Sequence, residues 1–308
     1  MKFSVAIPAF KARYLAEAIE SVLSQDYSDY ELVVVNDCSP EGVEDAVEPF
    51  ISNPHFRYYR NPVNIGAVDV VDNWNRCLEY SSGEYIICMG DDDRLKPDCL
   101  KVLDALMAKY PCLDVYHCRT EIIDSEGELI EVLEERPEYE SAYEMLFYRW
   151  KGRRQFIGDF CFAADRLRAE GGFFKLPLAW GADDISVYRA ACAGGIANTS
   201  IPVFQYRIHE KTISSNDNYP VKLNAMLAAR DWFAASLSGA VAHNEKENHY
   251  LEALREMLDR HFMEYPAFYV RMDVAKNHGK ALYWMMHFKE SRLGFWRTSK
   301  QVLKGLLQ

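Results

Sequence analysis

Apolar residues in the first hundred positions alternate between short continuous runs, typical of buried strands, and helical spacing. The expected strands cover residues 3–7, 32–35, 56–59 and 85–89, and the expected helices cover residues 15–23 and about 68–80. Strands that alternate with helices predict an α/β fold, a mainly parallel sheet with helices on both faces. Ligands of such sheets bind at the carboxyl ends of the strands. We therefore expect the residues after three of the strands, at Pro8, Asp37 and Asp91, to face one crevice.

The pattern changes beyond residue 110. Residues 119–154 are more irregular and acidic, with antiparallel strands expected at 121–123 and 129–133. From about Pro220 the pattern is helical, rich in Leu, Met and aromatic residues, and carries no further strand signal. We therefore expect an α/β domain over residues 1–219 and a helical C-terminal region over residues 220–308.

Composition limits the class of protein. The 308 residues are 49% hydrophobic, enough to bury a substantial core, and the formal net charge of -11 argues against a non-specific grip on nucleic-acid phosphates. The eight Cys residues are scattered, without the close pairs of a zinc site, so we interpret them as reduced core thiols. No apolar run approaches the roughly 20 residues that cross a bilayer, and we expect a cytoplasmic protein.

Three adjacent carboxylates, Asp91, Asp92 and Asp93, follow the expected strand at 85–89. Like charges held together at a strand end usually require a cation, and Mg2+ or Mn2+ takes one or two carboxylates together with substrate phosphates. The alternative is a surface turn that leads into a helix, where Asp is favoured by the helix dipole. This alternative explains one Asp well and three poorly.

At these residues the chain resembles family 2 of the inverting glycosyltransferases, which have the GT-A fold. The resemblance is carried by five segments in order, residues 3–10, 18–25, 31–39, 64–66 and 82–93, and continues more thinly to about residue 209. It implies that residues 1–110 bind a nucleotide sugar and that residues 111–219 form the acceptor side. The expected reaction moves a sugar from a nucleotide diphosphate, with UDP favoured, to an acceptor hydroxyl in the synthesis of surface polysaccharides or glycoconjugates.

The resemblance also implies which residues bind the nucleotide. The Asp after the second strand, which is Asp37 here, recognises the base in that family, and a carboxylate accepts a hydrogen bond from a uracil N–H. From spacing alone, helix capping explains Asp37 equally well. A glycine in the matching loop lets the backbone approach the nucleotide closely. The remaining matches are the base and ribose shelf, Pro8, Ala9 and Phe10, and the Asn-x-Gly loop, Asn64 and Gly66.

Family members often carry Asp-x-Asp-Asp after the fourth strand, and Gly90 stands here where the first Asp would be. The resemblance assigns Asp91 to the ribose or diphosphate side and Asp92 to a divalent metal. Asp93 is either a further metal ligand or a support for one. A shift of these roles by one position stays open.

Two further basic or metal-binding residues match the family stretch after the last strand of the catalytic domain. The resemblance implies that His209 meets the metal or the diphosphate and that Arg207 offsets phosphate charge as the leaving group departs. An ordinary structural role is the alternative for His209. Arg153 and Arg154 could also reach a phosphate, although a solvated charge pair is the simpler interpretation.

An acidic pair, Asp183 and Asp184, begins a later expected helix, with Arg189 one to two turns beyond. The family places its catalytic base in such a pair, where it deprotonates the acceptor hydroxyl as that oxygen attacks the anomeric carbon. Asp183 has the better spacing to Arg189, and Asp184 is the close alternative. Helix capping would account for one of the two.

Three other functions stay open. A sugar nucleotidyltransferase shares a related sheet, but residues 8–13 contain no glycine for its triphosphate loop. A non-catalytic sugar- or nucleotide-binding module is conceivable because fold alone does not establish activity, yet both acidic clusters are retained. A metal-dependent hydrolase would predict His-rich metal ligands, which the sequence lacks.

The C-terminal stretch has a distinct charge pattern. Residues 276–308 hold seven Lys or Arg against one Glu, interleaved with aromatic and aliphatic side chains. Such a segment suits the anionic inner face of a membrane, and it equally suits an ordinary packing helix with a basic solvent face. We expect the helical region to dock a saccharide or lipid-linked acceptor, to form a homodimer, or to hold the enzyme at that membrane, and the sequence does not choose among these.

Overall fold

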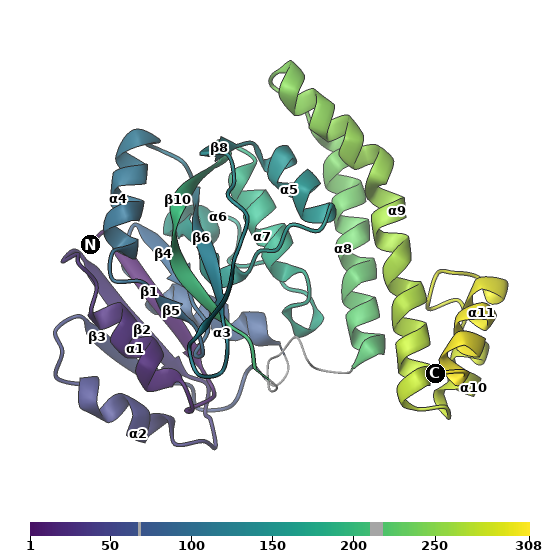
Figure 1. Cartoon of the computed structure of the whole chain (residues 1–308), viewed down its shortest axis with the longest axis horizontal. Helices are drawn as coiled ribbons and strands as arrows, with labels where there is room; N and C mark the ends of the chain where they lie inside the picture. The colour runs from purple at the N-terminus through teal and green to yellow at the C-terminus, as the bar shows by residue number, and fades with distance from the viewer. Residues whose placement is uncertain (67–68, 210–217) are drawn as a thin grey trace. The chain divides into compact units, whose positions relative to one another are not determined.

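The computed structural model describes residues 1–66, 69–209 and 218–308 (Figure 1). The chain divides into two compact units, the first made of Met1–Lys175 and Asp183–Glu210 and the second of Leu176–Ala182 and Lys211–Gln308. The expected boundary at Tyr219 falls on the first residue of α8 (Tyr219–Gly239). The short segment Leu176–Ala182, for which the sequence carries no signal, groups with the C-terminal helices.

Within the described residues the first unit contains a ten-stranded mixed sheet in the order β3-β2-β1-β4-β9-β6-β10-β5, with β7 paired to β6 and β8 to β10. Most strands run in one direction, because β1, β2, β3 and β4 pair in parallel and β9 is antiparallel to both β4 and β6. The expected mainly parallel α/β sheet is therefore confirmed. The strands are β1 Phe3–Ala9, β2 Tyr30–Asn36, β3 Phe56–Arg60, β4 Tyr85–Cys88, β5 Arg94–Leu95, β6 Val115–Ile123, β7 Leu129–Val132, β8 Tyr139–Glu140, β9 Phe160–Ala163 and β10 Ile196–Arg207.

Helices cover both faces of this sheet. Alternate β1 residues, Phe3, Val5 and Ile7, share one core with apolar residues of α1 and α4, whereas α3 packs on the other face of β1 and β2. Figure 1 shows α1 and α2 beside the purple strands at the N-terminal part of the chain. The α-helices of this unit are α1 Leu15–Leu23, α2 Val43–Val47, α3 Val70–Tyr80, α4 Cys99–Lys109, α5 Ala142–Trp150, α6 Ala164–Ala169 and α7 Ala182–Ala191, joined by the short 3-10 helices Glu48–Phe50 and Ile157–Asp159.

The expectation of irregular structure over residues 119–154 is wrong in part. The strand pair is present, since β6 and β7 are antiparallel. However, the segment also contains α5, whose first turn is capped by Ser141 through a hydrogen bond from the Glu144 amide. A Ser followed three residues later by Glu is a helix-start signal, so this helix was detectable from the sequence.

The second unit is helical. It consists of the 3-10 helix Pro177–Ala179 and of α8, α9 (Glu245–Lys276), α10 (Lys280–Met286) and α11 (Phe295–Leu306). The α11 helix packs through Thr298, Val302 and Gly305, and a Cβ at residue 305 would lie 2.6 Å from the Arg271 carbonyl oxygen. This close approach fixes which face of α11 is turned outward. Among the described residues, no helix is long and apolar enough to span a bilayer.

Five of the eight cysteines are buried, as expected of core thiols, while Cys38 is half-buried and Cys112 and Cys192 are exposed. All eight are free thiols. Their buried members pack as small apolar side chains, which is the usual role of an unpaired cysteine in a core.

Candidate active site

The sheet register brings the expected site loops to one edge. Ala9 at the end of β1 lies opposite Asn36 at the end of β2, and the parallel strand β4 ends next to β1 on the other side. The loops that follow these strands carry Phe10, Asp37 and Asp91. They are tied together, because the Asp37 amide donates to the Ala9 carbonyl oxygen at 2.9 Å.

Asp91 holds the loop that follows β1. Its Oδ2 accepts hydrogen bonds from the backbone amides of Phe10 at 2.8 Å and Lys11 at 2.7 Å. Burial, followed by the negative charge of Asp92, raises the pKa of Asp91 to about 6. The Pro8–Phe10 segment, expected to form the base and ribose shelf, is therefore anchored directly to the first aspartate of the cluster.

Asp37 organises a different loop. Its Oδ1 accepts from Asn61 Nδ2 at 2.7 Å and from the Ile65 amide at 3.0 Å, and its Oδ2 accepts from the Gly66 amide at 2.7 Å. A Cβ at residue 66 would lie 2.7 Å from that Oδ2, so only glycine lets the carboxylate seat there unchanged. Asn64 lies in the same loop. The alternative that Asp37 caps a helix is wrong, because α2 begins only at residue 43 and has no side-chain cap.

A carboxylate can accept about four hydrogen bonds, and three of those on Asp37 are donated by the protein. The side chain is also nearly buried, at 2% exposure. Its main effect in this structure is to fix the backbone of residues 61–66. Counting bonds from described residues, three of its roughly four acceptor positions are used.

Asp92 and His209 lie side by side beyond the ends of the strands. The His209 Nε2 is 2.8 Å from Asp92 Oδ2, and the His209 ring also packs against Tyr14 at a centroid distance of 5.3 Å. This distance is that of a hydrogen bond between the two side chains. Imidazole and carboxylate are both side-chain types that can ligate a divalent cation.

Asp93 has a different environment. It is buried, and its Oδ1 accepts a hydrogen bond of 3.0 Å from the Arg207 backbone amide. Among the described residues, no group of three or more His, Cys, Asp or Glu side chains is arranged to hold a metal ion. Asp92, Asp93 and His209 thus do not form a preformed three-ligand site. Asp93 instead connects the turn at residues 90–93 to β10 through the Arg207 amide.

Gly90 is required by the packing of these carboxylates. A Cβ at this position would lie 2.8 Å from Asp92 Oδ1 and 2.8 Å from Asp93 Oδ2. An Asp here, as in many family members, would need both side chains to rotate. The departure of this sequence from the Asp-x-Asp-Asp pattern is therefore consistent with its local geometry.

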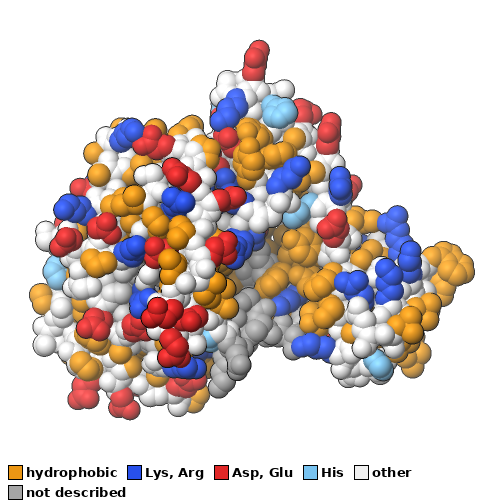
Figure 2. Space-filling model, in the orientation of Figure 1, with side chains coloured by type: hydrophobic (Ala, Val, Ile, Leu, Met, Phe, Trp, Pro, Cys, Tyr) orange, Lys and Arg blue, Asp and Glu red, His pale blue; other side chains and the backbone are white. Residues whose placement is uncertain are grey.

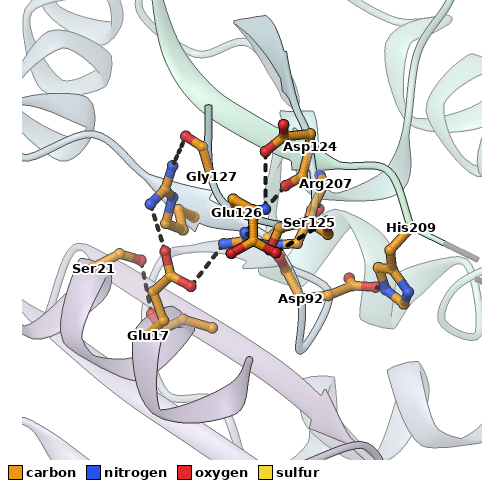
Figure 3. Close-up of polar contacts among 12 residues, drawn as sticks. Glu17, Ser21, Asp92, Asp124, Ser125, Glu126, Gly127, Arg207 and His209 are labelled. Atoms are coloured by element: carbon orange, nitrogen blue, oxygen red, sulfur yellow. Dashed lines mark hydrogen bonds and ion pairs between the residues drawn. The ribbon is translucent and has the colours of Figure 1, made fainter. Parts of the chain in front are cut away.

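Arg207 is the centre of a network that joins distant parts of the first unit (Figure 3). Its guanidinium donates to the Asp92 carbonyl oxygen at 2.8 Å, to Glu17 Oε2 at 2.8 Å and to the carbonyl oxygens of Asp124 and Ser125 at 3.2 and 3.3 Å. The side chain is buried at 1% exposure. These contacts commit its donors to the protein, which favours a role in positioning Asp92 over direct contact with a phosphate.

The acidic pair at the start of α7 contains two unlike carboxyls. Asp184 Oδ1 accepts from Arg149 Nε at 2.7 Å and from Gln155 Nε2 at 3.0 Å. Burial, followed by the charge of Asp184, raises the pKa of Asp183 to about 7. Asp184 is therefore held as the partner of a cation, whereas Asp183 is poised to exchange a proton near neutral pH.

Arg189 has a structural task. Its Nε donates to Glu170 Oε2 at 2.9 Å and its Nη2 donates to the carbonyl oxygens of Glu170 and Gly172. These bonds tie α7 to the turn that precedes residue 173. The spacing between Asp183 and Arg189 is therefore explained by the way Arg189 anchors α7.

One segment links the acidic pair to the aspartate cluster. Gln155 binds Asp184, and Phe156 stacks on Tyr206 at a centroid distance of 3.6 Å, next to Arg207. A Cβ on Gly158 would lie 3.4 Å from the Cα of Met89, which directly precedes the cluster. Both groups of carboxylates therefore border the same part of the first unit.

Sequence reasoning missed several residues that support this site, and they share no motif. Glu17 lies on the exposed side of an amphipathic helix, Arg149 lies in the segment expected to be irregular, and Gln155 directly follows that segment. Arg94 was the detectable one, because it follows the aspartates directly and binds Glu17 and the Gly127 carbonyl oxygen.

Sequence comparison finds glycosyltransferases that are similar to part of this chain. WcaA of Escherichia coli (strain K12), named as a colanic acid biosynthesis glycosyl transferase, is 37% identical over 102 residues, which is 32% of this chain and 35% of WcaA. A β-1,3-glucosyltransferase of Campylobacter jejuni named for GalNAc(5)-diNAcBac-PP-undecaprenol is 31% identical over 104 residues, 33% of each chain. The matches thus span about a third of the length of these relatives.

Among solved structures, Staphylococcus aureus TarS 1-349 in complex with UDP-GlcNAc superposes with a TM-score of 0.68, at 16% identity, over 99% of this chain and 92% of that one. The likeness supports the expected GT-A fold. The model of the family described as "Glycosyl transferase family 2" matches residues 4–168, more than half of the 308 residues. The chain belongs to glycosyl transferase family 2.

Proposed function

We propose that the chain is an inverting glycosyltransferase that moves a sugar from a nucleotide diphosphate to an acceptor hydroxyl. The observation that carries the proposal is the pair of unlike carboxyls at α7, with Asp183 near its titration point, on a segment that also borders the aspartate cluster. Perturbed carboxyls concentrate at catalytic sites because acid–base chemistry near neutral pH needs them.

The donor nucleotide binds, in this proposal, at the edge formed by the ends of β1, β2 and β4. Asp37 presets the loop that contains Asn64 and Gly66, and its remaining acceptor position receives a ring N–H of the base. Asp91 presets the Pro8–Phe10 shelf for the base and ribose. Preset loops reduce the ordering entropy that binding would otherwise cost.

Asp92 and His209 are the residues that would hold a divalent cation. One or two protein ligands are usual for Mg2+, whose remaining positions are filled by water and substrate phosphates. The cation, when bound, supplies positive charge that stabilises the departing diphosphate. Asp93 and Arg207 would not contact the cation. They hydrogen-bond to each other and to the Asp92 backbone and thereby keep this turn in place.

Asp183 is the proposed base. Its carboxylate takes the proton of the acceptor hydroxyl while that oxygen forms a bond to the anomeric carbon, on the face opposite the breaking bond to the diphosphate. This single displacement inverts the anomeric configuration. The negative charge of Asp184 raises the pKa of Asp183, and Arg149, which pairs with Asp184, offsets part of that effect.

The names of similar proteins suggest the substrate class. TarS is named as a poly(ribitol-phosphate) β-N-acetylglucosaminyltransferase, and its structure contains UDP-GlcNAc. WcaA is named for the biosynthesis of a polysaccharide. We therefore propose a UDP-sugar donor and a saccharide or lipid-linked acceptor in the synthesis of a surface glycan.

The outward face of α11 suits an anionic membrane surface. Trp296, Leu303 and Leu307 are 83%, 62% and 87% exposed and lie opposite the face that packs on α9. Figure 2 shows Lys and Arg side chains gathered beside hydrophobic ones over this part of the second unit. The cations that flank the exposed apolar face are Arg297, Lys300 and Lys304. Apolar insertion combined with attraction to acidic headgroups would bring the enzyme to a lipid-linked acceptor.

Calorimetric titration of UDP, GDP, dTDP and CDP, each with and without Mn2+, tests the proposal on the wild type and on Asp92→Ala. Asp165→Ala is the matched control, because it removes a carboxylate of the same unit that is 99% exposed. We expect one nucleotide to bind only with the metal and Asp92→Ala to lose that binding, while Asp165→Ala keeps it. A folded protein that binds none of the four nucleotides would refute the transferase and favour a non-catalytic module.

A further inference from the structure

A cavity of about 350 Å3 opens in the first unit beside β6, β7 and α5. Its wall includes His117 from β6, Arg136 from the strand connection and Arg153 from the turn after α5. Its rim includes Lys151, Arg154 and the acidic side chains Glu131 and Glu134. The volume is within the range of roughly 300–1,000 Å3 that is typical of small-molecule pockets.

The wall of this cavity contains two buried cations that share one buried anion. Arg153 Nη2 donates to Glu140 Oε2 at 2.7 Å, and Arg136 Nη1 lies 3.5 Å from Glu140 Oε1. Arg136 and Arg153 are only 7% and 8% exposed, and Glu140 is fully buried. The interpretation of Arg153 as part of a solvated pair is therefore wrong, although Arg154 is exposed and pairs with Glu131.

The Asp159 carboxyl offsets only part of the positive charge of the two guanidinium groups. Burial raises the pKa of Asp159 to about 7, so this carboxyl is only partly ionised at neutral pH. Burial, followed by the charge of Arg153, lowers the pKa of Arg136 to about 10. Burial and the neighbouring cation therefore both disfavour the charged form of Arg136. Burial lowers the pKa of His117 as well, so its imidazole is neutral.

Polar atoms in the wall lack hydrogen bonds. Arg136 Nη1, Arg153 Nε and His117 Nδ1 are buried and make no hydrogen bond to any described residue, and Nδ1 is a donor in the tautomer that carries its proton there. Native proteins rarely leave buried N–H groups unsatisfied, and such a group usually marks a bound ion, water or ligand. Guanidinium groups in particular match the oxygens of phosphates and carboxylates.

The cavity adjoins the proposed base. Arg149 Nη1 donates to the Arg153 carbonyl oxygen at 3.2 Å, and Arg149 Nε donates to Asp184. Gln155, two residues after Arg153, donates to the same Asp184 oxygen. The turn at residues 151–155 therefore forms the cavity wall on one side and supports the acidic pair on the other.

We propose that this cavity is an acceptor subsite that binds an oxyanion, a phosphate or carboxylate group of the acceptor, through Arg136, Arg153 and His117. The role of the cavity as an acceptor subsite rests on the proposed transferase function, whereas the binding of an anion does not. The oxyanion accepts hydrogen bonds from the unpartnered donors and balances the second buried guanidinium. Lys151 at the rim attracts the anion and guides it inward.

The test is calorimetric titration of inorganic phosphate and of glucuronate at saturating UDP and Mg2+, so that neither anion reports on the donor site. We expect the wild type to bind at least one of them and Arg136→Gln to weaken that binding at least tenfold. Arg76→Gln is the matched control, because it makes the same change on an exposed Arg of the first unit, and its affinity should stay within twofold. Lys151→Ala, an exposed rim variant that leaves the buried pair intact, should weaken binding about threefold.

Each outcome separates the alternatives. Binding of phosphate alone indicates a phosphorylated acceptor, binding of glucuronate alone indicates a uronate, and binding of both supports the shared oxyanion chemistry. Equal affinity of the wild type, Arg136→Gln and Lys151→Ala, or no binding of either anion by a protein that binds UDP, would overturn the subsite. Binding of phosphate at the cavity by a protein that binds no nucleotide would instead refute the transferase and leave the anion site standing.

Discussion

The variant Asp183→Asn distinguishes the proposed role of Asp183 as the base from the role of Asp184. The amide is nearly the same size as the carboxyl but cannot take a proton from the acceptor hydroxyl, and a positioned general base contributes about 10²–10⁴-fold to the rate. We therefore expect kcat to fall at least 100-fold. Asp184→Asn should cost far less, because the amide oxygen still accepts from Arg149 and Gln155.

The pH dependence gives a second, independent signature. With a pKa of about 7, Asp183 is about one-tenth ionised at pH 6 and about nine-tenths ionised at pH 8, so the wild-type rate should rise about tenfold between these values. The charge of Asp184 contributes to the raised pKa. Asp184→Asn should therefore shift the rising limb of the profile to lower pH.

Unfolding measurements guard against a trivial loss of activity. A carboxyl whose pKa is raised in the folded state favours folding in its protonated form, and that stability is lost as the pH rises from about 4 through about 7. Asp183→Asn removes this penalty. The variant should be more stable than the wild type at pH 8, with a smaller difference at pH 4.

The assay is UDP release from the UDP-sugar that binds, first with water as the acceptor hydroxyl and then with a glycan acceptor. Rates are measured from pH 5 to pH 9 for the wild type, Asp183→Asn and Asp184→Asn. If folded Asp183→Asn keeps more than a tenth of the rate while Asp184→Asn loses 100-fold, the roles of the two residues are reversed. A wild-type rate that does not change between pH 6 and pH 8 would remove Asp183 as the titrating base.

Three further changes probe other parts of the chain. Gly66→Ala should weaken UDP binding at least fivefold in calorimetry, because its Cβ would lie 2.7 Å from Asp37 Oδ2, and unchanged affinity would show that this loop does not bind the nucleotide. Arg207→Ala should lower the free energy of urea unfolding by about 2 kcal/mol, since it removes a buried side chain and leaves the Asp92 carbonyl oxygen without this donor, and a loss under 1 kcal/mol would contradict the network. Trp296→Ser should reduce flotation with vesicles rich in phosphatidylserine but not change the mass in light scattering, whereas conversion of a dimer to a monomer would identify this face as a contact between two copies.

The first third of the fold is predictable because its elements are short and their patterns are clean. Each buried strand is a continuous apolar run, and α1 shows one apolar face, so period and length identify them. The parallel arrangement then places the residues after each strand at one edge, and the register of Ala9 with Asn36 confirms that placement. The roles of the individual carboxylates at this edge are harder to predict, because they depend on which backbone or side-chain donors bind each carboxylate oxygen.

The segment around α5 shows where sequence reasoning fails. Its residues mix charged and aromatic side chains and the helix is buried on several sides, so no single apolar face stands out, and only the Ser141 cap marks the helix in the sequence. Arg153 and Glu140 look like surface charges in the sequence, yet they are buried together. Long-range pairing of opposite charges leaves no periodic trace in a sequence.

Arg207 shows how a motif leaves the contacts of a residue undefined. The family motif implies a cation near a diphosphate, and Arg207 is the last residue of β10. What the motif does not contain is Glu17, which lies 190 positions earlier and takes one arm of the guanidinium while Arg94 binds its other oxygen. Because the donors of a buried guanidinium need partners, these contacts favour a role of Arg207 in holding the Asp92 turn. The residues most informative about function in this chain are therefore Asp183, whose pKa is raised to about 7, and the buried Arg136 and His117, which each have a side-chain nitrogen without a hydrogen bond to a described residue.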